Sequence, residues 1–190
     1  MRGLTIDAHG GPEQLRYRED LAIPALGGPR SVRVRMRAAA LNRLDLFMLG
    51  GLPGVAITPP WVLGADGTGI IEEVGAEVSH LRPGDRVVIN GGISCGACEF
   101  CLAGEQSLCT TFGVLGEHRS GTFAEQIVLP ASNVRVIPAH IPDEIAASYT
   151  LATLTAWRMC VTRAAVREGD EVLIWGIGGG VALAAMLICK

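Results

Sequence analysis

Residues 93–109 read ISCGACEFCLAGEQSLC, a short segment with four cysteines in the spacing C-x2-C-x2-C-x7-C. The four are Cys95, Cys98, Cys101 and Cys109. Four thiolates so close in sequence can close a tetrahedral shell around one metal ion, with no coordination position left open for chemistry. The segment therefore predicts a loop held rigid by a structural zinc ion. It does not predict metal-activated hydrolysis, because no histidine lies inside the cluster and no ligand position is left for water.

Two other chemistries compete with zinc for this cysteine pattern. Ferredoxin-type iron–sulfur proteins also use C-x2-C-x2-C, but they continue with x3-C-P, whereas here seven residues precede Cys109 and Thr110 follows it. Disulfides are the second alternative. The start, MRGLTIDAHG, has no apolar signal segment, which favours a reducing, cytoplasmic compartment and hence metal binding. Cys160 and Cys189 lie outside the cluster, and we interpret them as small buried hydrophobic residues.

The composition is that of a globular protein with a core of aliphatic side chains. Hydrophobic residues make up 49% of the 190 residues and aromatic residues only 5%, so the core must rely on Val, Ile, Leu and Ala. The 25 glycines and 10 prolines favour many turns and short strands. A net charge of −3 provides no general attraction for nucleic acid or an anionic membrane, and we expect neither as a partner.

The first part of the chain predicts short strands, and the pattern changes to helix near Pro142. In the segment 31–40, Arg33, Arg35 and Arg37 alternate with apolar residues, which indicates a strand with one solvated face. A phosphate-binding patch is the alternative for these arginines. Strands are predicted at 5–7, 15–18, 31–40, 69–74, 86–90, 122–129 and 133–137, and helices at 42–49 and 146–163.

The end of the chain predicts a strand, a glycine turn and a helix. Residues 171–175 are the strand, and an apolar stretch continues to Lys190. Such a turn lets the backbone approach a pyrophosphate at the helix N-terminus, and its candidate cofactor-binding residues are Gly176, Gly178, Gly179, Gly180 and Val181. A purely structural turn and a membrane span over 172–189 are the alternatives. Four glycines among five residues oppose the span, because each costs a helix roughly 1 kcal/mol relative to Ala.

These motifs occur together in one order with GADGTGIIEEVG (64–75), RPGDRVVIN (82–90), GTFAEQIVLP (121–130) and EVLIWGIGGGVALAA (171–185). Over essentially its whole length the chain resembles the N-terminal part of the medium-chain dehydrogenase/reductase superfamily, the zinc-type alcohol dehydrogenases and quinone oxidoreductases. The resemblance implies a GroES-like β-barrel catalytic domain at 1–142 with a zinc lobe at 91–112. It also implies that 143–190 is the first βα unit of an incomplete Rossmann domain for NAD or NADP, in a mixed β and α/β fold.

The resemblance also locates the positions that hold a catalytic zinc in alcohol dehydrogenases. The three ligand positions match Asn42, Ala65 and Leu151 here, and neither Ala65 nor Leu151 has a donor atom. We therefore expect one structural zinc and no catalytic zinc. Asn42 and Asp45 become the candidate catalytic residues: Asn42 as a hydrogen-bond donor to a developing enolate oxygen, and Asp45 as a residue that orients nearby groups. The competing interpretation is a helix cap for Asn42 and an ion pair with an arginine for Asp45.

The expected function is hydride transfer from a nicotinamide cofactor to an activated alkene, quinone or carbonyl of a small-molecule substrate. Thr155 matches a position near the nicotinamide in the family, whereas His118 in GEHRSG is interpreted as an ordinary surface residue. The alternatives are an alcohol dehydrogenase with a rearranged metal site and a non-catalytic, zinc-stapled binding module. We expect the 190-residue chain to be inactive by itself, and a homodimer through the Rossmann sheet only in a full-length protein.

Overall fold

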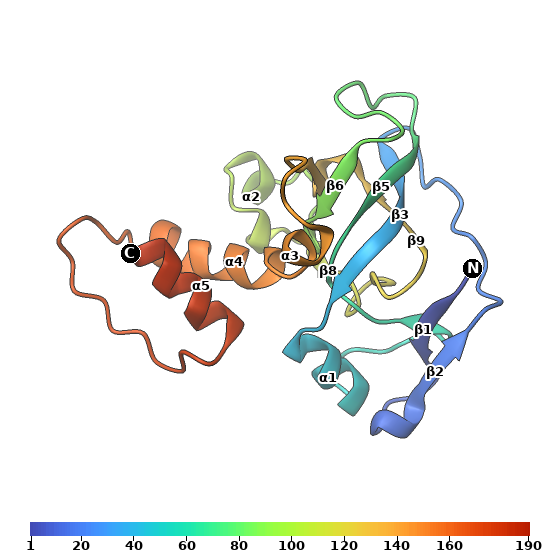
Figure 1. Cartoon of the computed structure of the whole chain (residues 1–190), viewed down its shortest axis with the longest axis horizontal. Coiled ribbons are helices and arrows are strands. Elements are labelled where there is room, and N and C mark those ends of the chain that lie inside the picture. Colours follow the sequence, from blue (N-terminus) through green and yellow to red (C-terminus); the bar gives the residue numbers. More distant parts are fainter. The chain divides into compact units, whose positions relative to one another are not determined.

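The computed structural model describes all residues, Met1–Lys190, and the chain divides into two compact units, Met1–Ser148 and Tyr149–Lys190 (Figure 1). The division falls slightly later than the predicted boundary after residue 142. The reason is that Asp143 is tied into the first unit: its carboxylate accepts a hydrogen bond of 2.8 Å from Arg86 Nε, and its backbone carbonyl accepts one of 3.2 Å from Thr68. No helix in either unit is long and apolar enough to cross a membrane.

The first unit is built from three antiparallel sheets. Their orders are β2-β1-β4, β10-β6-β5-β3-β9 and β7-β8. The strands are β1 (Gly3–Ile6), β2 (Leu15–Arg18), β3 (Ser31–Ala40), β4 (Trp61–Val62), β5 (Asp66–Val74), β6 (Arg86–Ile89), β7 (Gly92–Ile93), β8 (Gly113–Val114), β9 (Gln126–Pro130) and β10 (Val134–Val136). The sheets do not close into one barrel, which corrects the expectation of a β-barrel: β9 and β10 are the two unpaired edges of the large sheet.

The alternation predicted for residues 31–40 is confirmed in β3. Val32 and Val34 are fully buried in the main core, together with residues of β5, β6, β9 and β10. The arginines between them point to the other face, where Arg33 pairs with Glu73 at 2.5 Å and Arg35 with Glu72 at 2.9 Å across the β3–β5 pairing. The predicted solvated strand face is therefore a ladder of ion pairs.

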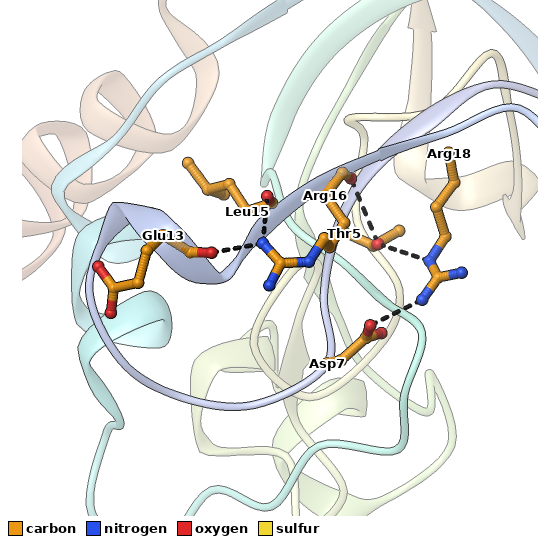
Figure 2. Close-up of polar contacts among 6 residues, drawn as sticks. All are labelled: Thr5, Asp7, Glu13, Leu15, Arg16 and Arg18. Atoms are coloured by element: carbon orange, nitrogen blue, oxygen red, sulfur yellow. Dashed lines mark hydrogen bonds and ion pairs between the residues drawn. The ribbon is translucent and has the colours of Figure 1, made fainter.

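The N-terminal hairpin of β1 and β2 is held by arginine side chains (Figure 2). Arg18 donates from Nε to Thr5 Oγ1 at 3.2 Å and from its terminal nitrogen to Asp7 at 2.7 Å. Arg16 donates to the backbone carbonyls of Glu13 and Leu15. The hydroxyl of Thr5 is fully buried, so the hydrogen bond from Arg18 satisfies a group that water cannot reach.

The helices of the first unit are short. They are α1 (Arg43–Gly50), α2 (Glu99–Leu102) and α3 (Asp143–Ala147), with 3-10 turns at Pro12–Gln14, Gln106–Leu108 and Ala131–Asn133. The predicted helix at 42–49 corresponds to α1. It ends because Gly51 adopts a left-handed conformation with φ of +93° and donates its N–H to the carbonyl of Met48.

The second unit is helical, with α4 (Thr150–Trp157), a π-helical turn (Arg158–Arg163) and α5 (Gly180–Cys189). Ala156, Cys160, Ala184 and Ala185 form its small core. The single helix predicted at 146–163 is instead divided between α3, α4 and the π turn. The strand predicted at 171–175 does not form, because no other strand of this unit is present to accept its hydrogen bonds. Its Leu173 and Trp175 are 88% and 91% exposed.

Asp143 joins two arginines of the large sheet to α3 and should stabilise the first unit measurably. Its carboxylate contacts Arg86 at 2.8 Å and Arg37 at 3.5 Å, and its side chain is 19% exposed. We expect Asp143→Asn to lower the free energy of unfolding by about 1–2 kcal/mol, because hydrogen bonds to a charged group are lost in a partly desolvated place. Urea unfolding measures this. The control is Glu77→Gln, whose 3.5 Å pair with Arg30 is well exposed; an equal loss there would contradict the assignment.

Candidate functional site

The four cysteines of the zinc lobe converge on one point. Their Sγ atoms all lie within 4.8 Å of one another, and Cys95 Sγ and Cys101 Sγ are 3.9 Å apart. A zinc ion with four Zn–S bonds of about 2.3 Å places its sulfur atoms about 3.8 Å apart. One zinc ion therefore fits the cluster with little rearrangement. The donor set is sulfur alone, which is the set of a closed structural zinc site.

Local backbone geometry prepares these sulfur atoms for a metal. Cys95 follows β7, Cys98 is the N-cap of α2, Cys101 lies within α2, and Cys109 follows the second 3-10 turn. Backbone N–H groups of Ala97 and Cys98 donate to Cys95 Sγ at 3.4 and 3.3 Å. Such N–H···S bonds stabilise a thiolate and fix its direction.

The thiols of the cluster differ in acidity. Hydrogen bonds from the backbone N–H of Cys95 and from Thr111 lower the pKa of Cys109 to about 6. A backbone hydrogen bond at Cys101 is the main cause that lowers the pKa of Cys98. Burial has the opposite effect on Cys101 and raises its pKa to about 11. A bound metal requires all four as thiolates, so zinc binding would release protons from the cluster.

The predicted catalytic residues lie in a second, polar cluster at the start of α1. Asn42 Nδ2 donates to Asp66 Oδ2 at 3.0 Å. The carboxylate of Asp45 accepts the backbone N–H of Asn42 at 2.7 Å and that of Gly64 at 3.1 Å. Asp45 is 4% exposed and Asp66 1%. Burial is the largest cause that raises the pKa of Asp45; the nearby Asp66 adds to it, and the two backbone N–H groups partly oppose it.

These hydrogen bonds distinguish the roles proposed for Asn42 and Asp45. Asp45 pairs with no arginine. Its carboxylate instead connects the N-terminus of α1 to the turn before β5 by hydrogen bonds to both. Asn42 occupies the N-cap of α1 in a capping box with Asp45, as the competing interpretation held, and its Nδ2 also donates to Asp66. Gly64 is required in this turn: its φ is +99°, and an added Cβ would lie 2.5 Å from Thr122 Oγ1.

The contact between Asn42 and Asp66 was not predicted from the sequence. The signal for it is the pairing of β3 with β5, in which Ala40 lies opposite Asp66 and so brings residue 42 near residue 66. Ala65, at the position of the second zinc ligand in the resemblance, is fully buried and carries only a methyl group. Leu151, at the third position, lies in α4 of the second unit.

The candidate cofactor residues all lie in the second unit. Thr155 is on α4 and donates its hydroxyl to the carbonyl of Leu151 at 2.8 Å. Gly176 adopts φ of +75°, Gly179 is the N-cap of α5, and α5 begins at Gly180 and Val181. No atom would lie within 4 Å of a Cβ at Gly176 or Gly178, so the turn is open to solvent. Gly180 lies against α4, because its Cβ position is 3.4 Å from Ala152.

The remaining predicted residues behave as expected. His118 is exposed, and its Nδ1 accepts the backbone N–H of Val114 at 3.2 Å, which stabilises a surface turn. Cys160 is buried and Cys189 is partly buried in the core of the second unit.

Comparison with known proteins places the chain in a family. Residues 28–140 match the alcohol dehydrogenase GroES-like domain. The L-threonine 3-dehydrogenase of Anaeromyxobacter sp. (strain Fw109-5) is 38% identical over 165 residues, which are 84% of this chain and 46% of that protein. An alcohol dehydrogenase of Schizosaccharomyces pombe is 32% identical over 184 residues, 96% of this chain and 51% of that protein.

A solved structure agrees with these relatives. The crystal structure of an NAD-dependent alcohol dehydrogenase is 49% identical and superposes with a TM-score of 0.94, over 100% of this chain and 55% of that chain. The chain thus belongs to the zinc-type medium-chain dehydrogenase/reductase superfamily, and it contains that family's GroES-like domain. It spans about half the length of the relatives that it matches.

Proposed function

We propose that this chain is the catalytic half of an NAD(P)-dependent oxidoreductase that holds one structural zinc and no catalytic zinc. The observation that carries this proposal is the contrast between the two clusters. Four sulfur atoms lie within 4.8 Å of one another in the zinc lobe. At the other site Asn42 is hydrogen-bonded to a carboxylate and Ala65 has no donor atom.

The proposed reaction is hydride transfer between the cofactor and a small-molecule substrate, either an activated alkene, a quinone or a carbonyl compound. A bound nicotinamide supplies the hydride, and the protein supplies orientation and electrostatic stabilisation. Without a Lewis acid, the substrate oxygen needs hydrogen-bond donors while it gains negative charge. The side-chain amide of Asn42 has two N–H donors, and Asp66 accepts one hydrogen bond from it. The second donor is the group that we assign to the substrate oxygen.

In this proposal Asp45 is a positioning residue. Both of its carboxylate oxygens accept backbone N–H groups, and it is too deeply buried to reach a substrate. The cofactor is proposed to contact Thr155 and the glycine turn before α5. The relatives include an NAD-dependent alcohol dehydrogenase and an L-threonine 3-dehydrogenase.

The catalytic role of Asn42 predicts a kinetic effect in the enzyme that contains this chain and a complete cofactor domain. Asn42→Ala should lower kcat by about 10–100-fold and leave the KM for the cofactor nearly unchanged, because a donor to developing charge is lost. Steady-state kinetics with NADH and NADPH measures this. The control is His118→Ala, an exposed change away from the cluster, which should leave kcat unchanged. An unaltered kcat in Asn42→Ala would contradict the assigned role.

A zinc-dependent alcohol dehydrogenase with a rearranged metal site is the second candidate, because buried carboxylates lie beside Asn42 and the relatives include alcohol dehydrogenases. Elemental analysis separates the two. One zinc per chain supports the proposed function, and two would support the alternative.

The third candidate is a non-catalytic, zinc-stapled binding module. Failure of the completed protein to bind either nicotinamide cofactor would favour this candidate. The 190-residue chain alone is expected to bind neither cofactor with micromolar affinity.

A further inference from the structure

The two cysteines outside the zinc lobe meet in the core of the second unit. Cys160 lies in the π-helical turn after α4 and is 8% exposed. Cys189 is the last residue of α5 and packs, partly buried, against the same core. Their thiols are in hydrogen-bonding contact, and both are free in the structure. Neither thiol belongs to the zinc cluster, and the proposed function uses neither of them.

The contact between the two thiols is part of a regular packing of α5 alongside α4 (Figure 1). At the start of α5, a Cβ added to Gly180 would lie 3.4 Å from Cβ of Ala152 in α4. One helical turn further along, Ala156 and Ala184 are buried in the shared core. The two cysteines follow after about one further turn of each helix. Since residues four apart lie on one face of a helix, the cysteines belong to the faces by which the two helices touch.

The packing brings the two backbones to a separation that a disulfide can span. The Cβ atoms of a disulfide lie about 3.5–4.5 Å apart, and its sulfur atoms about 2 Å apart. The approach of Gly180 to Ala152 shows that small residues let these helices run at nearly this Cβ separation. Because the thiols of Cys160 and Cys189 are already in contact, rotation of the side chains suffices to bring the sulfur atoms to bonding distance.

The surroundings of the two thiols give them different reactivities. Burial raises the pKa of the Cys160 thiol most, and the hydrogen bond with Cys189 and the charge of the Cys189 thiolate raise it further. A protonated, buried thiol reacts slowly, since the thiolate is the nucleophile. Cys189 is the more exposed of the two and is the first to meet an oxidant in solution. Once Cys189 is oxidised it carries no charge, so Cys160 loses its proton more easily.

We propose that Cys160 and Cys189 are a redox-active pair that forms a reversible disulfide with a small-molecule disulfide as the oxidant. The Cys189 thiolate attacks one sulfur of the oxidant, whose S–S bond breaks, and the leaving thiolate takes up the proton of Cys189. The Cys160 thiolate then attacks Cys189 Sγ and expels the second thiolate, which takes up the proton of Cys160. Two electrons thus pass from the cysteines to the oxidant, which becomes two thiols.

The new bond would join the end of α5 to the π turn and close a ring that contains the glycine turn before α5. It goes beyond the proposed dehydrogenase function, since it requires neither zinc nor nicotinamide. In the oxidised chain α5 can no longer separate from α4 at this end. We therefore expect the amides of α5 to exchange their hydrogens about tenfold more slowly than in the reduced chain, because local opening is restricted. Equal exchange rates would overturn this consequence of the bond.

The test is incubation of the zinc-loaded, 190-residue chain with oxidised glutathione. Free thiols are then blocked with iodoacetamide, and tryptic peptides are analysed by mass spectrometry without reductant. We expect residues 159–163 to be joined to residues 168–190, dithiothreitol to separate them, and the zinc content to be unchanged. Alkylation of both cysteines after prolonged incubation would overturn the proposal. A disulfide from either cysteine to the zinc lobe or to a second chain, in place of this one, would also overturn it.

Two variants test the order of the steps. Cys160→Ala lacks the second nucleophile and should stop with one glutathione bound at Cys189. Cys189→Ala should leave Cys160 reduced, with a reaction at least about tenfold slower than that of Cys189 in the first variant, because the remaining thiol is buried and protonated. Zinc content and circular dichroism should match those of the unaltered chain and serve as the control for folding. Equal rates in two folded variants would show that the proposed order is wrong.

Discussion

Replacement of Cys109 by serine is expected to release zinc and to lower the free energy of unfolding by about 4 kcal/mol or more. Cys109 is buried, its Sγ accepts backbone N–H groups from Cys95 and Thr111, and it is the ligand that joins the end of the zinc lobe to its beginning. A structural zinc contributes its binding free energy directly to folding. The measurements are zinc content by elemental analysis and thermal or urea unfolding with and without EDTA.

The matched control is Cys189→Ser, a cysteine outside the cluster, which should keep one zinc per chain. A melting temperature that is unchanged both by EDTA and by Cys109→Ser would contradict the structural role. The stripped chain should also rebind zinc more tightly as the pH rises through about 6. The low pKa of Cys109 means that its thiolate appears first, whereas the pKa of about 11 at Cys101 means that a proton still competes with zinc for that sulfur atom at higher pH.

Asp45→Ala is expected to lower the free energy of unfolding by about 2–4 kcal/mol. The substitution leaves the backbone N–H groups of Asn42 and Gly64 without an acceptor in a place that is 4% exposed. The start of α1 would lose its attachment to the turn before β5, and with it the position of Asn42. Chemical unfolding measures the stability. The control is Asp7→Ala, since Asp7 holds Arg18 at the surface and should cost much less.

The pKa of Asp45 adds a pH dependence to this prediction. Burial raises the pKa, so the folded chain binds a proton at Asp45 more readily than the unfolded chain does. The contribution of Asp45 to stability is therefore complete below its ordinary pKa of 3.8 and falls as the pH rises through the raised value. As the pH rises through this range, the free energies of unfolding of the unaltered chain and of Asp45→Asn should become more similar. A difference that widens with pH would show that the carboxylate form is the favoured one.

Short, regular spacings of residue types along the sequence predicted the local structures well, because these structures depend on local geometry. The spacing of the four cysteines sufficed to predict a metal cluster. The alternation in residues 31–40 predicted β3 with its exact bounds, and Leu15–Arg18 was likewise predicted as β2. Side chains two residues apart share one face of any strand, so the pattern needs no knowledge of the partner.

Predictions that depend on contacts with residues distant in the sequence were less accurate. Residues 171–175 have the composition of a strand but remain unpaired, because a strand needs a second strand for its hydrogen bonds. The helix predicted at 146–163 is interrupted where Asp143 and its short helix are held by Arg86 of β6. The closed barrel is replaced by three sheets, since closure depends on which strand edges meet.

The sequence by itself determined that four cysteine thiols lie close enough along the chain to share one metal ion and that Ala65 and Leu151 have no metal-binding atom, because residue identity alone decides which donor atoms exist. Only the tertiary structure decided what the side chain of Asn42 contacts. The pairing of β3 with β5 brings Asp66 to its side chain, and Asp45 fixes its backbone. Contacts between residues 24 positions apart depend on strand register, which no local pattern of side chains specifies.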